Sequence, residues 1–256
     1  MRMNGKRVIV TAGASGMGRA GATLMAREGA TVAIVDIAKD RAQQVVDEIT
    51  AAGGRAHAFA ADLSRAEECQ HVIDEAAGWM GGLDALWSHA GIPGPAAIEG
   101  LDLDAYRLAV DLNLTSAIIC AGAAAPHMRK VGKGAILFTS SIGGLVGSPH
   151  APVYSAAKFG IVGLTMSLGL RYAPENIRVN AVCPGPIDTP MLPSFFARSD
   201  DKKDHEENFK KLMAAVPMGR LGKPEEIGHA AMWLLSDDAS YVTGVALPVD
   251  GGYVAR

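Results

Sequence analysis

The chain has 256 residues, of which 49% are hydrophobic and 20% charged, as in a folded globular protein rather than a disordered one. Its net charge of −3 gives no basic surface for nucleic acid and no polybasic segment for a membrane, so we expect neither partner. The apolar stretch behind the N-terminus is too short for a signal peptide or a membrane span. Three widely spaced cysteines without metal-ligand spacing are typical of reduced thiols, so we expect a cytoplasmic protein without a metal site.

Apolar, strand-like runs alternate with amphipathic stretches up to about position 185. This alternation is typical of a parallel sheet with helices on both faces. We predict strands over residues 6–10, 31–36, 55–60, 83–88, 135–139, 177–182 and 245–249. Helices are expected over residues 17–28, 40–52, 105–130 and 154–172, with two more after a capping box at 64–67 and at Pro224.

The chain contains no low-complexity linker, no repeat and no shift in composition that would mark a domain boundary. We therefore expect one domain over residues 1–256, an α/β fold with a doubly wound sheet of about seven parallel strands. The segment 189–217 departs from the alternation, because it is long, rich in charge and apolar at its start. Connections of that length are usually functional or mobile, so this segment is expected to form a lid over a substrate.

A glycine-rich turn, Thr11-Ala12-Gly13-Ala14-Ser15-Gly16-Met17-Gly18, joins the first strand to a helix. Such glycines let the backbone approach a pyrophosphate, which then lies on the unpaired amides and the positive dipole end of the helix. A plain glycine turn is the alternative, but the order strand, turn, helix favours a dinucleotide site. The expected cofactor contacts are Gly13, Ser15, Gly16, Met17 and Gly18.

Asp36 ends the second strand, eighteen positions after Gly18. A carboxylate there accepts two ribose hydroxyl groups and repels a 2′-phosphate, which favours NAD over NADP, with Ile37 beside it. A solvated acid at a strand end is the alternative. Asp62 and Leu63 follow the third strand and are expected at the adenine edge, although Asp62 could equally be a turn residue.

Tyr154 and Lys158 stand four positions apart at the start of a helix, so both side chains project from one face. A nearby ammonium favours the phenolate, and lowering the pKa of a phenol from about 10 to near 7 requires about 4 kcal/mol. A lone pair of this kind is common on helix surfaces. Ser141, however, follows the fifth strand, where the carboxyl ends of parallel strands line a ligand crevice.

With these motifs in order, the sequence resembles the short-chain dehydrogenase/reductase family over essentially its whole length. The matching residues are the turn 11–18, Asp62-Leu63, Ser88-His89-Ala90-Gly91, Asn113, Ser141, Tyr154, Lys158, Asn180 and Pro184-Gly185 leading to Thr189. The resemblance implies a Rossmann-like single domain and a homo-tetramer. Subunits would pack through the long helices around Asn113 and Tyr154, with residues 244–256 at another interface.

The resemblance also implies roles for the matching residues. Tyr154 would be the general acid in reduction and the base in oxidation, while Lys158 would lower its pKa and hold the nicotinamide ribose. Ser141 would bind the substrate oxygen, and Asn113 would hold a water that links Lys158 to solvent. Further cofactor contacts would come from His89, Ala90, Gly91, Pro184, Gly185, Ile187 and Thr189.

Two departures from the family pattern are visible. Ala12 stands where the family has its first glycine, which we expect to weaken cofactor binding without abolishing it. Ser88-His89 replaces an Asn-Asn pair, so His89 has either a structural role or a contact with the cofactor. For the substrate, His150 is expected either to line the pocket or to face solvent. Met191, Leu192, Phe195 and Phe196 form either an apolar lid or the buried face of a short helix.

These residues predict an NAD-dependent oxidoreductase that transfers a hydride between nicotinamide and a small secondary alcohol or ketone. One alternative is a 3-oxoacyl thioester reductase, against which Asp36 argues because such reductases usually take NADPH. Another is a noncatalytic NAD-binding sensor or scaffold. The complete set of Asn113, Ser141, Tyr154 and Lys158 argues against that second alternative.

Overall fold

The computed structural model describes residues 1–195 and 202–255, and its seven strands form one parallel sheet in the order β3-β2-β1-β4-β5-β6-β7. The predicted doubly wound parallel sheet is therefore confirmed. The strands are β1 (Arg7–Thr11), β2 (Thr31–Asp36), β3 (Arg55–Ala60), β4 (Ala85–Ser88), β5 (Gly134–Thr139), β6 (Ile177–Pro184) and β7 (Ala246–Val249).

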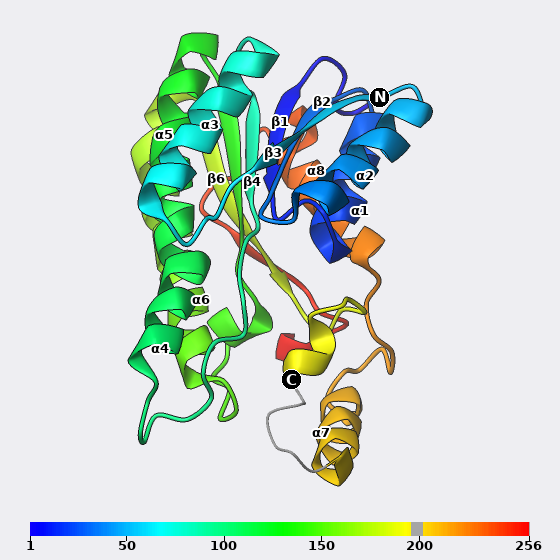
Figure 1. Ribbon diagram of the computed structural model, residues 1–256, viewed down its shortest axis with the longest axis vertical. Helices are drawn as coiled ribbons and strands as arrows, with labels where there is room; N and C mark the ends of the chain where they lie inside the picture. The colour runs from blue at the N-terminus through cyan, green and yellow to red at the C-terminus, as the bar shows by residue number, and fades with distance from the viewer. Residues whose placement is uncertain (196–201, 256) are drawn as a thin grey trace.

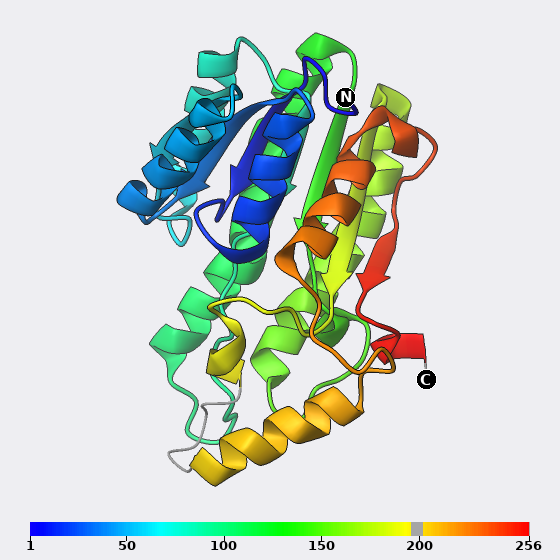
Figure 2. The same cartoon turned by 90° about the vertical axis from the view of Figure 1, so that its right-hand side faces the viewer.

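Helices cover both faces of the sheet (Figure 1). One face carries α3 (Ala66–Met80), α4 (Leu103–Val110), α5 (Ser116–Val131) and α6 (Pro152–Tyr172). The other carries α1 (Gly16–Arg27), α2 (Lys39–Ala51) and α8 (Pro224–Leu235). Short 3-10 turns lie at Ile142–Gly144, Ala173–Glu175, Leu192–Phe195, Asp237–Ala239 and Tyr253–Ala255. Figure 2 shows α7 (Lys202–Ala214) lying beyond the carboxyl ends of the strands.

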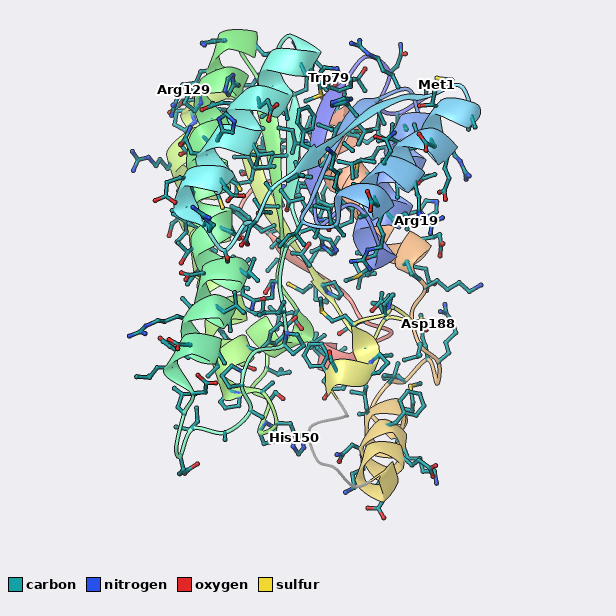
Figure 3. All side chains as sticks on the ribbon, viewed as in Figure 1. Met1, Arg19, Trp79, Arg129, His150 and Asp188 are labelled. Atoms are coloured by element: carbon teal, nitrogen blue, oxygen red, sulfur yellow. The ribbon has the colours of Figure 1, made fainter. Side chains whose placement is uncertain are left out.

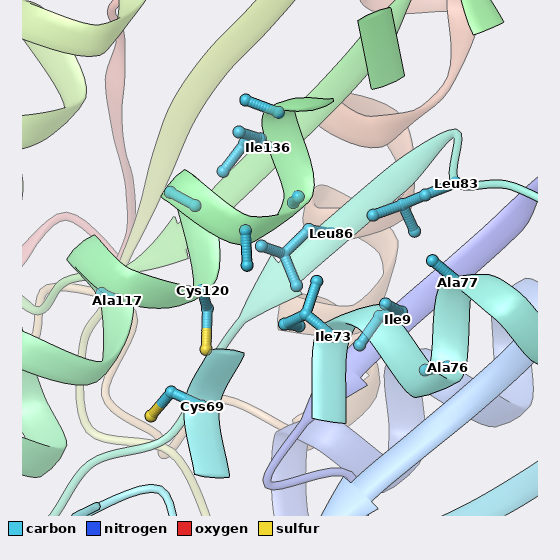
Figure 4. Close-up of a cluster of buried hydrophobic side chains, with 14 of the residues drawn as sticks. Ile9, Cys69, Ile73, Ala76, Ala77, Leu83, Leu86, Ala117, Cys120 and Ile136 are labelled. Carbon is cyan, nitrogen blue, oxygen red and sulfur yellow. The ribbon is translucent and has the colours of Figure 1, made fainter. Parts of the chain in front are cut away.

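Two apolar layers hold the helices to the sheet, because the central strands are buried on both faces. Alternate residues of β1 point to opposite layers, with Ile9 in one cluster and Val8 and Val10 in the other. Figure 4 shows part of the cluster beneath α3 and α5, where Cys69 and Cys120 lie among aliphatic side chains. Each fully buried aliphatic side chain contributes about 1.5–3 kcal/mol to folding.

The helix expected over 105–130 is interrupted in the structure. A π-helical turn at Asp111–Thr115 separates α4 from α5 and contains Asn113. The amide of Asn113 donates to the carbonyl oxygens of Ala109 and Ile92, each at 2.8 Å, which holds the side chain against the loop after β4. Single π-turns of this kind often occur at functional sites.

Two other local expectations need correction. The proposed capping box at 64–67 is wrong, because α3 begins at Ala66 and the Ser64 hydroxyl donates to Asp62 at 2.7 Å. The carboxylate of Glu68, rather than that of Glu67, accepts a bond from the backbone at this site, from the Asp62 amide. The connection 189–217 contains a helix, α7, that the sequence analysis did not predict.

Candidate active site

The strand order reverses between β1 and β4, and a cleft opens at the carboxyl ends of the neighbouring strands. Ligands of open α/β sheets bind at such a reversal. The cleft has a volume of about 770 Å³. Predicted site residues that line it are Met17, Ser141, His150, Tyr154, Pro184, Gly185, Ile187, Thr189, Met191 and Phe195.

The turn after β1 has the close backbone packing that a dinucleotide site needs. A Cβ atom at Gly18 would lie 2.3 Å from the Ala12 carbonyl oxygen, and one at Gly13 would lie 2.9 Å from Ile34. Ser15 is the N-cap of α1 but makes no side-chain capping bond, so the first amides of the helix stay available to an anion. These residues therefore fit the diphosphate of a nicotinamide dinucleotide.

Asp36 lies beside this turn at the end of β2. Its two carboxylate oxygens accept the backbone amides of Ala14, at 3.1 Å, and Ala38, at 2.9 Å. Each oxygen keeps lone pairs for a further donor, so the fixed carboxylate can accept ribose hydroxyl groups. Ile37 next to it is 69% exposed.

Asp62 and Leu63 are engaged within the protein. One Asp62 oxygen accepts both the amide and the hydroxyl of Ser64, and these bonds lower the pKa of the carboxyl group. The turn role that the sequence left open for Asp62 is therefore present in the structure. Leu63 is buried in the core beneath α3.

The segment after β4 is tied to both neighbouring strands. The Thr11 hydroxyl oxygen accepts the amides of His89, at 2.8 Å, and Ala90, at 3.3 Å. The His89 ring bonds through Nδ1 to the Thr139 hydroxyl at 2.8 Å. A Cβ atom at Gly91 would lie 2.5 Å from Asn113 Oδ1 and 3.2 Å from Lys158 Nζ, so a side chain there would displace these two groups.

The four predicted catalytic residues lie around the carboxyl end of β5. The Lys158 ammonium donates to the Thr139 carbonyl at 2.9 Å and lies 5.5 Å from the centre of the Tyr154 ring. The Ser141 hydroxyl accepts the Gly143 amide at 3.0 Å. Asn113 Oδ1 is buried and has no hydrogen-bond partner among the described residues, so it remains available to a donor such as a water.

Burial is the largest influence on the pKa values of Tyr154 and Lys158. It raises the pKa of Tyr154 to about 12, an effect that the polar contact with Ser141 partly opposes. Burial also lowers the pKa of Lys158 to about 8. The expectation that Lys158, helped by the positive charge of an oxidised nicotinamide, lowers the pKa of Tyr154 stays a prediction. A phenolate needs a further positive charge in the cleft.

Several residues of the site were not predicted from the sequence. Ser140 donates to the Lys158 carbonyl at 2.9 Å, and Cys183 lies buried nearby with its pKa raised by burial to about 11. Asn208, Lys211 and Leu212 of α7 and Tyr253 also line the cleft. The one signal for Ser140 and Thr139 is their place at the end of the strand that precedes Ser141.

The wall expected to contact substrate is partly apolar. Phe195 packs edge-on against the Tyr154 ring, with 5.2 Å between ring centres, and Met191 lines the cleft beside it. Figure 3 shows His150 at the end of the molecule where α7 lies. Phe196 falls outside the described residues. Within residues 1–195 and 202–255, no group of three His, Cys, Asp or Glu side chains could hold a metal ion.

Comparison with known proteins supports the motif analysis. A family model described as enoyl-(acyl carrier protein) reductase matches residues 11–254. Cyclohexanol dehydrogenase of Acinetobacter sp. strain SE19 is 38% identical over 256 residues, covering 100% of this chain and 97% of that protein. Cis-4-hydroxycyclohexanecarboxylate dehydrogenase of Sinomonas cyclohexanicum is 41% identical over 249 residues, covering 96% of each.

Other relatives carry different names on the same fold. A 3-oxoacyl-[acyl-carrier-protein] reductase of Thermotoga maritima is 34% identical, covering 99% of this chain and 100% of that protein. A solved structure assigned as an NAD(P)-dependent gluconate 5-dehydrogenase of Beutenbergia cavernae, with NADP bound at low occupancy, is 33% identical with a TM-score of 0.92 and complete coverage of both chains. The chain therefore belongs to the short-chain dehydrogenase/reductase family, as its motifs predicted.

The conformation of Ala12 yields a testable prediction. Its φ angle is 51°, in the left-handed region, which costs a non-glycine residue about 1–2 kcal/mol. Replacement by glycine removes this strain, but the added conformational entropy of glycine stabilises the unfolded state by about 0.4–1 kcal/mol. Ala12→Gly should therefore raise the free energy of unfolding by about 0.5–1 kcal/mol in urea titrations. Ala105→Gly, within α4, should lower it by a similar amount. A loss of stability in Ala12→Gly would contradict the strain.

Proposed function

We propose that this protein is an NAD-dependent dehydrogenase/reductase of a small secondary alcohol or ketone carried on a ring, with Tyr154 as its acid/base. The observation that carries the proposal is the grouping of Ser141, Tyr154 and Lys158 at one end of a partly apolar cleft beside the glycine turn. The ring-shaped substrate class is supported by the relatives named for cyclohexanol and hydroxycyclohexanecarboxylate.

Ser141, Tyr154 and Lys158 each have a separate role in the proposed reaction. When bound, the oxidised nicotinamide supplies the hydride acceptor and a positive charge in the cleft. Ser141 orients the substrate oxygen toward Tyr154. As the phenolate, Tyr154 takes the hydroxyl proton during oxidation and becomes the phenol, which gives the proton back during reduction. Lys158, held by Thr139, would favour the phenolate and hold the nicotinamide ribose. Apolar walls at Met191 and Phe195 limit water beside the reacting carbon.

Cofactor preference follows from Asp36. We expect a higher kcat/KM with NAD than with NADP, because the carboxylate repels a 2′-phosphate and no basic residue lies between Ala12 and Gly18. Asp36→Ala should lower the ratio of kcat/KM with NAD to kcat/KM with NADP about tenfold, which corresponds to about 1.4 kcal/mol. Asp40→Ala, on the exposed start of α2, serves as the control. An equal or better kcat/KM with NADP in the unmodified enzyme would refute NAD preference and favour the thioester-reductase alternative.

The acid/base role is tested at the phenol. Tyr154→Phe removes the proton carrier and should lower kcat by about 10²- to 10⁴-fold, while NAD affinity, measured by fluorescence titration, stays nearly unchanged. Lys158→Ala should impair both turnover and NAD affinity. Tyr106→Phe on α4 is a matched control with no expected effect. Near-normal turnover in Tyr154→Phe would eliminate the assigned chemistry.

We further propose that residues 189–217 close over the bound substrate. Support comes from two parts of this segment that line the cleft, Met191 and Phe195 near its start and Asn208, Lys211 and Leu212 in α7. Hydrogen exchange across 189–217 should be fast in the enzyme alone and slow with NAD and an inhibitory substrate analogue. Slow exchange in both conditions would show a fixed wall.

A homo-tetramer is our proposal for the assembly. Apolar residues Ile118 of α5 and Phe159, Met166 and Leu170 of α6 are exposed, Leu170 at 81%. Leu103–Val131 and Pro152–Glu175 are long and apolar enough to cross a membrane by length and composition. Both segments pack on the sheet, as core helices do, so their exposed apolar faces are better explained by copies of this chain.

Light scattering should give a mass four times the 26.6 kDa chain. Leu170→Asp should lower this mass by placing a charge in the interface. Gln44→Asp, on the exposed face of α2, is the control and should leave the mass unchanged. A monomer at micromolar concentration would contradict the proposal.

A further inference from the structure

Thr139, the last residue of β5, joins two parts of the site. Its hydroxyl oxygen lies 2.8 Å from the indole nitrogen of Trp87 and 2.8 Å from Nδ1 of His89. Its backbone carbonyl accepts the Lys158 ammonium at 2.9 Å. The residue whose side chain bonds to Trp87 and His89 is therefore also the residue whose carbonyl accepts Lys158.

The direction of these bonds determines the tautomer of His89. An indole N–H only donates, so the Thr139 oxygen accepts from Trp87. The single hydrogen of the Thr139 hydroxyl has no other acceptor among the described residues, which directs it to Nδ1 of His89 and leaves the ring hydrogen on Nε2. Burial and the nearby Lys158 charge hold the pKa of His89 at about 3, so the ring stays neutral and Nδ1 stays an acceptor.

We propose that His89 is a positioning residue for Lys158: through Nδ1 it fixes the Thr139 side chain, and the Thr139 carbonyl in turn holds the ammonium beside Tyr154. The His89 ring also packs against the indole of Trp87, with 4.8 Å between ring centres, which fixes its orientation. This inference rests on the roles proposed above for Tyr154 and Lys158.

The Thr139 carbonyl matters to Lys158 because the titratable groups around the ammonium do not carry a negative charge near pH 7. Tyr154 from α6, Cys183 from β6 and His89 from the end of β4 are the titratable neighbours, and all three are neutral near pH 7. Desolvation opposes the ammonium, whose pKa is about 8, and only the charge of an ionised Cys183 is seen to favour it. The charge of Asp250 raises the pKa of Cys183 and is not among the causes that shift the pKa of Lys158. Loss of the Thr139 carbonyl should lower the pKa of Lys158, leaving the Tyr154 phenolate without its cation.

Three substitutions at His89 separate an acceptor role from a packing role. His89→Asn keeps an acceptor near the position of Nδ1, whereas His89→Leu keeps bulk without one. His89→Gln carries its amide nearer the position of Nε2, so it should behave like His89→Leu and provides a second variant if the leucine protein does not fold. The acidic limb of the pH profile of kcat/KM for alcohol oxidation, which reports the loss of the Tyr154 proton, is measured for each.

We expect the leucine and glutamine variants to shift this limb upward by about one pH unit and to lower kcat/KM about tenfold at pH 7. His89→Asn should restore the unmodified profile. In parallel, carbon-13 NMR of labelled lysine should show a lower pKa for Lys158 in the leucine variant without any turnover. Lys158→Met identifies its signal.

An unshifted limb and an unchanged Lys158 titration in the leucine and glutamine variants would overturn the inference and leave His89 a packing role. A shift in His89→Asn equal to that in His89→Leu would overturn the acceptor account as well. Failure of the proposed function is distinguished by Tyr154→Phe in the same assay, because substantial turnover there removes the phenol from the chemistry whatever the His89 variants do.

Discussion

The reversal of strand order between β1 and β4 is the constraint on which the rest of the site depends. Because the chain leaves these two neighbours toward opposite faces of the sheet, their carboxyl ends are not covered by one crossover. The bonds from Thr11 to the amides of His89 and Ala90 hold the two ends together without filling the crevice. The glycine turn and Asp36 lie on one side of this point, and the Tyr154 group lies on the other.

Burial encloses Tyr154 and Lys158 in the site, and it also opposes the charged forms that they need for base catalysis. A phenol and an ammonium enclosed together both favour their neutral forms, which is the opposite of the pairing that base catalysis requires. The protein meets this cost with backbone acceptors such as the Thr139 carbonyl rather than with a carboxylate. A buried carboxylate beside Lys158 would stabilise the ammonium, but it would also repel the phenolate.

The sequence predicted the sheet and its strands, because hydrophobic period and glycine position are local signals. The catalytic roles of Asn113, Ser141, Tyr154 and Lys158 came from the resemblance to the family and stay a prediction. The sequence did not predict the π-turn at Asn113, since one residue inserted into a helix leaves the apolar pattern nearly unchanged. Helix α7 was taken for a connection because charged residues dominate it. The links from Thr139 to His89 and Lys158 join residues 50 and 19 positions apart, and only the folded chain brings them together.

The strand order also has a consequence for the order in which the site is assembled during synthesis. The glycine turn, Asp36 and the first three strands come from the first 60 residues, and β2 and β3 pair with no later strand, so this part of the sheet can form early. The second half of the sheet, β4 to β7, forms only after β4 pairs with β1. Its last strand, β7, pairs with β6 from Ala246 onward. A ribosome-bound chain would therefore complete the turn after β1 long before it completes the group around Tyr154.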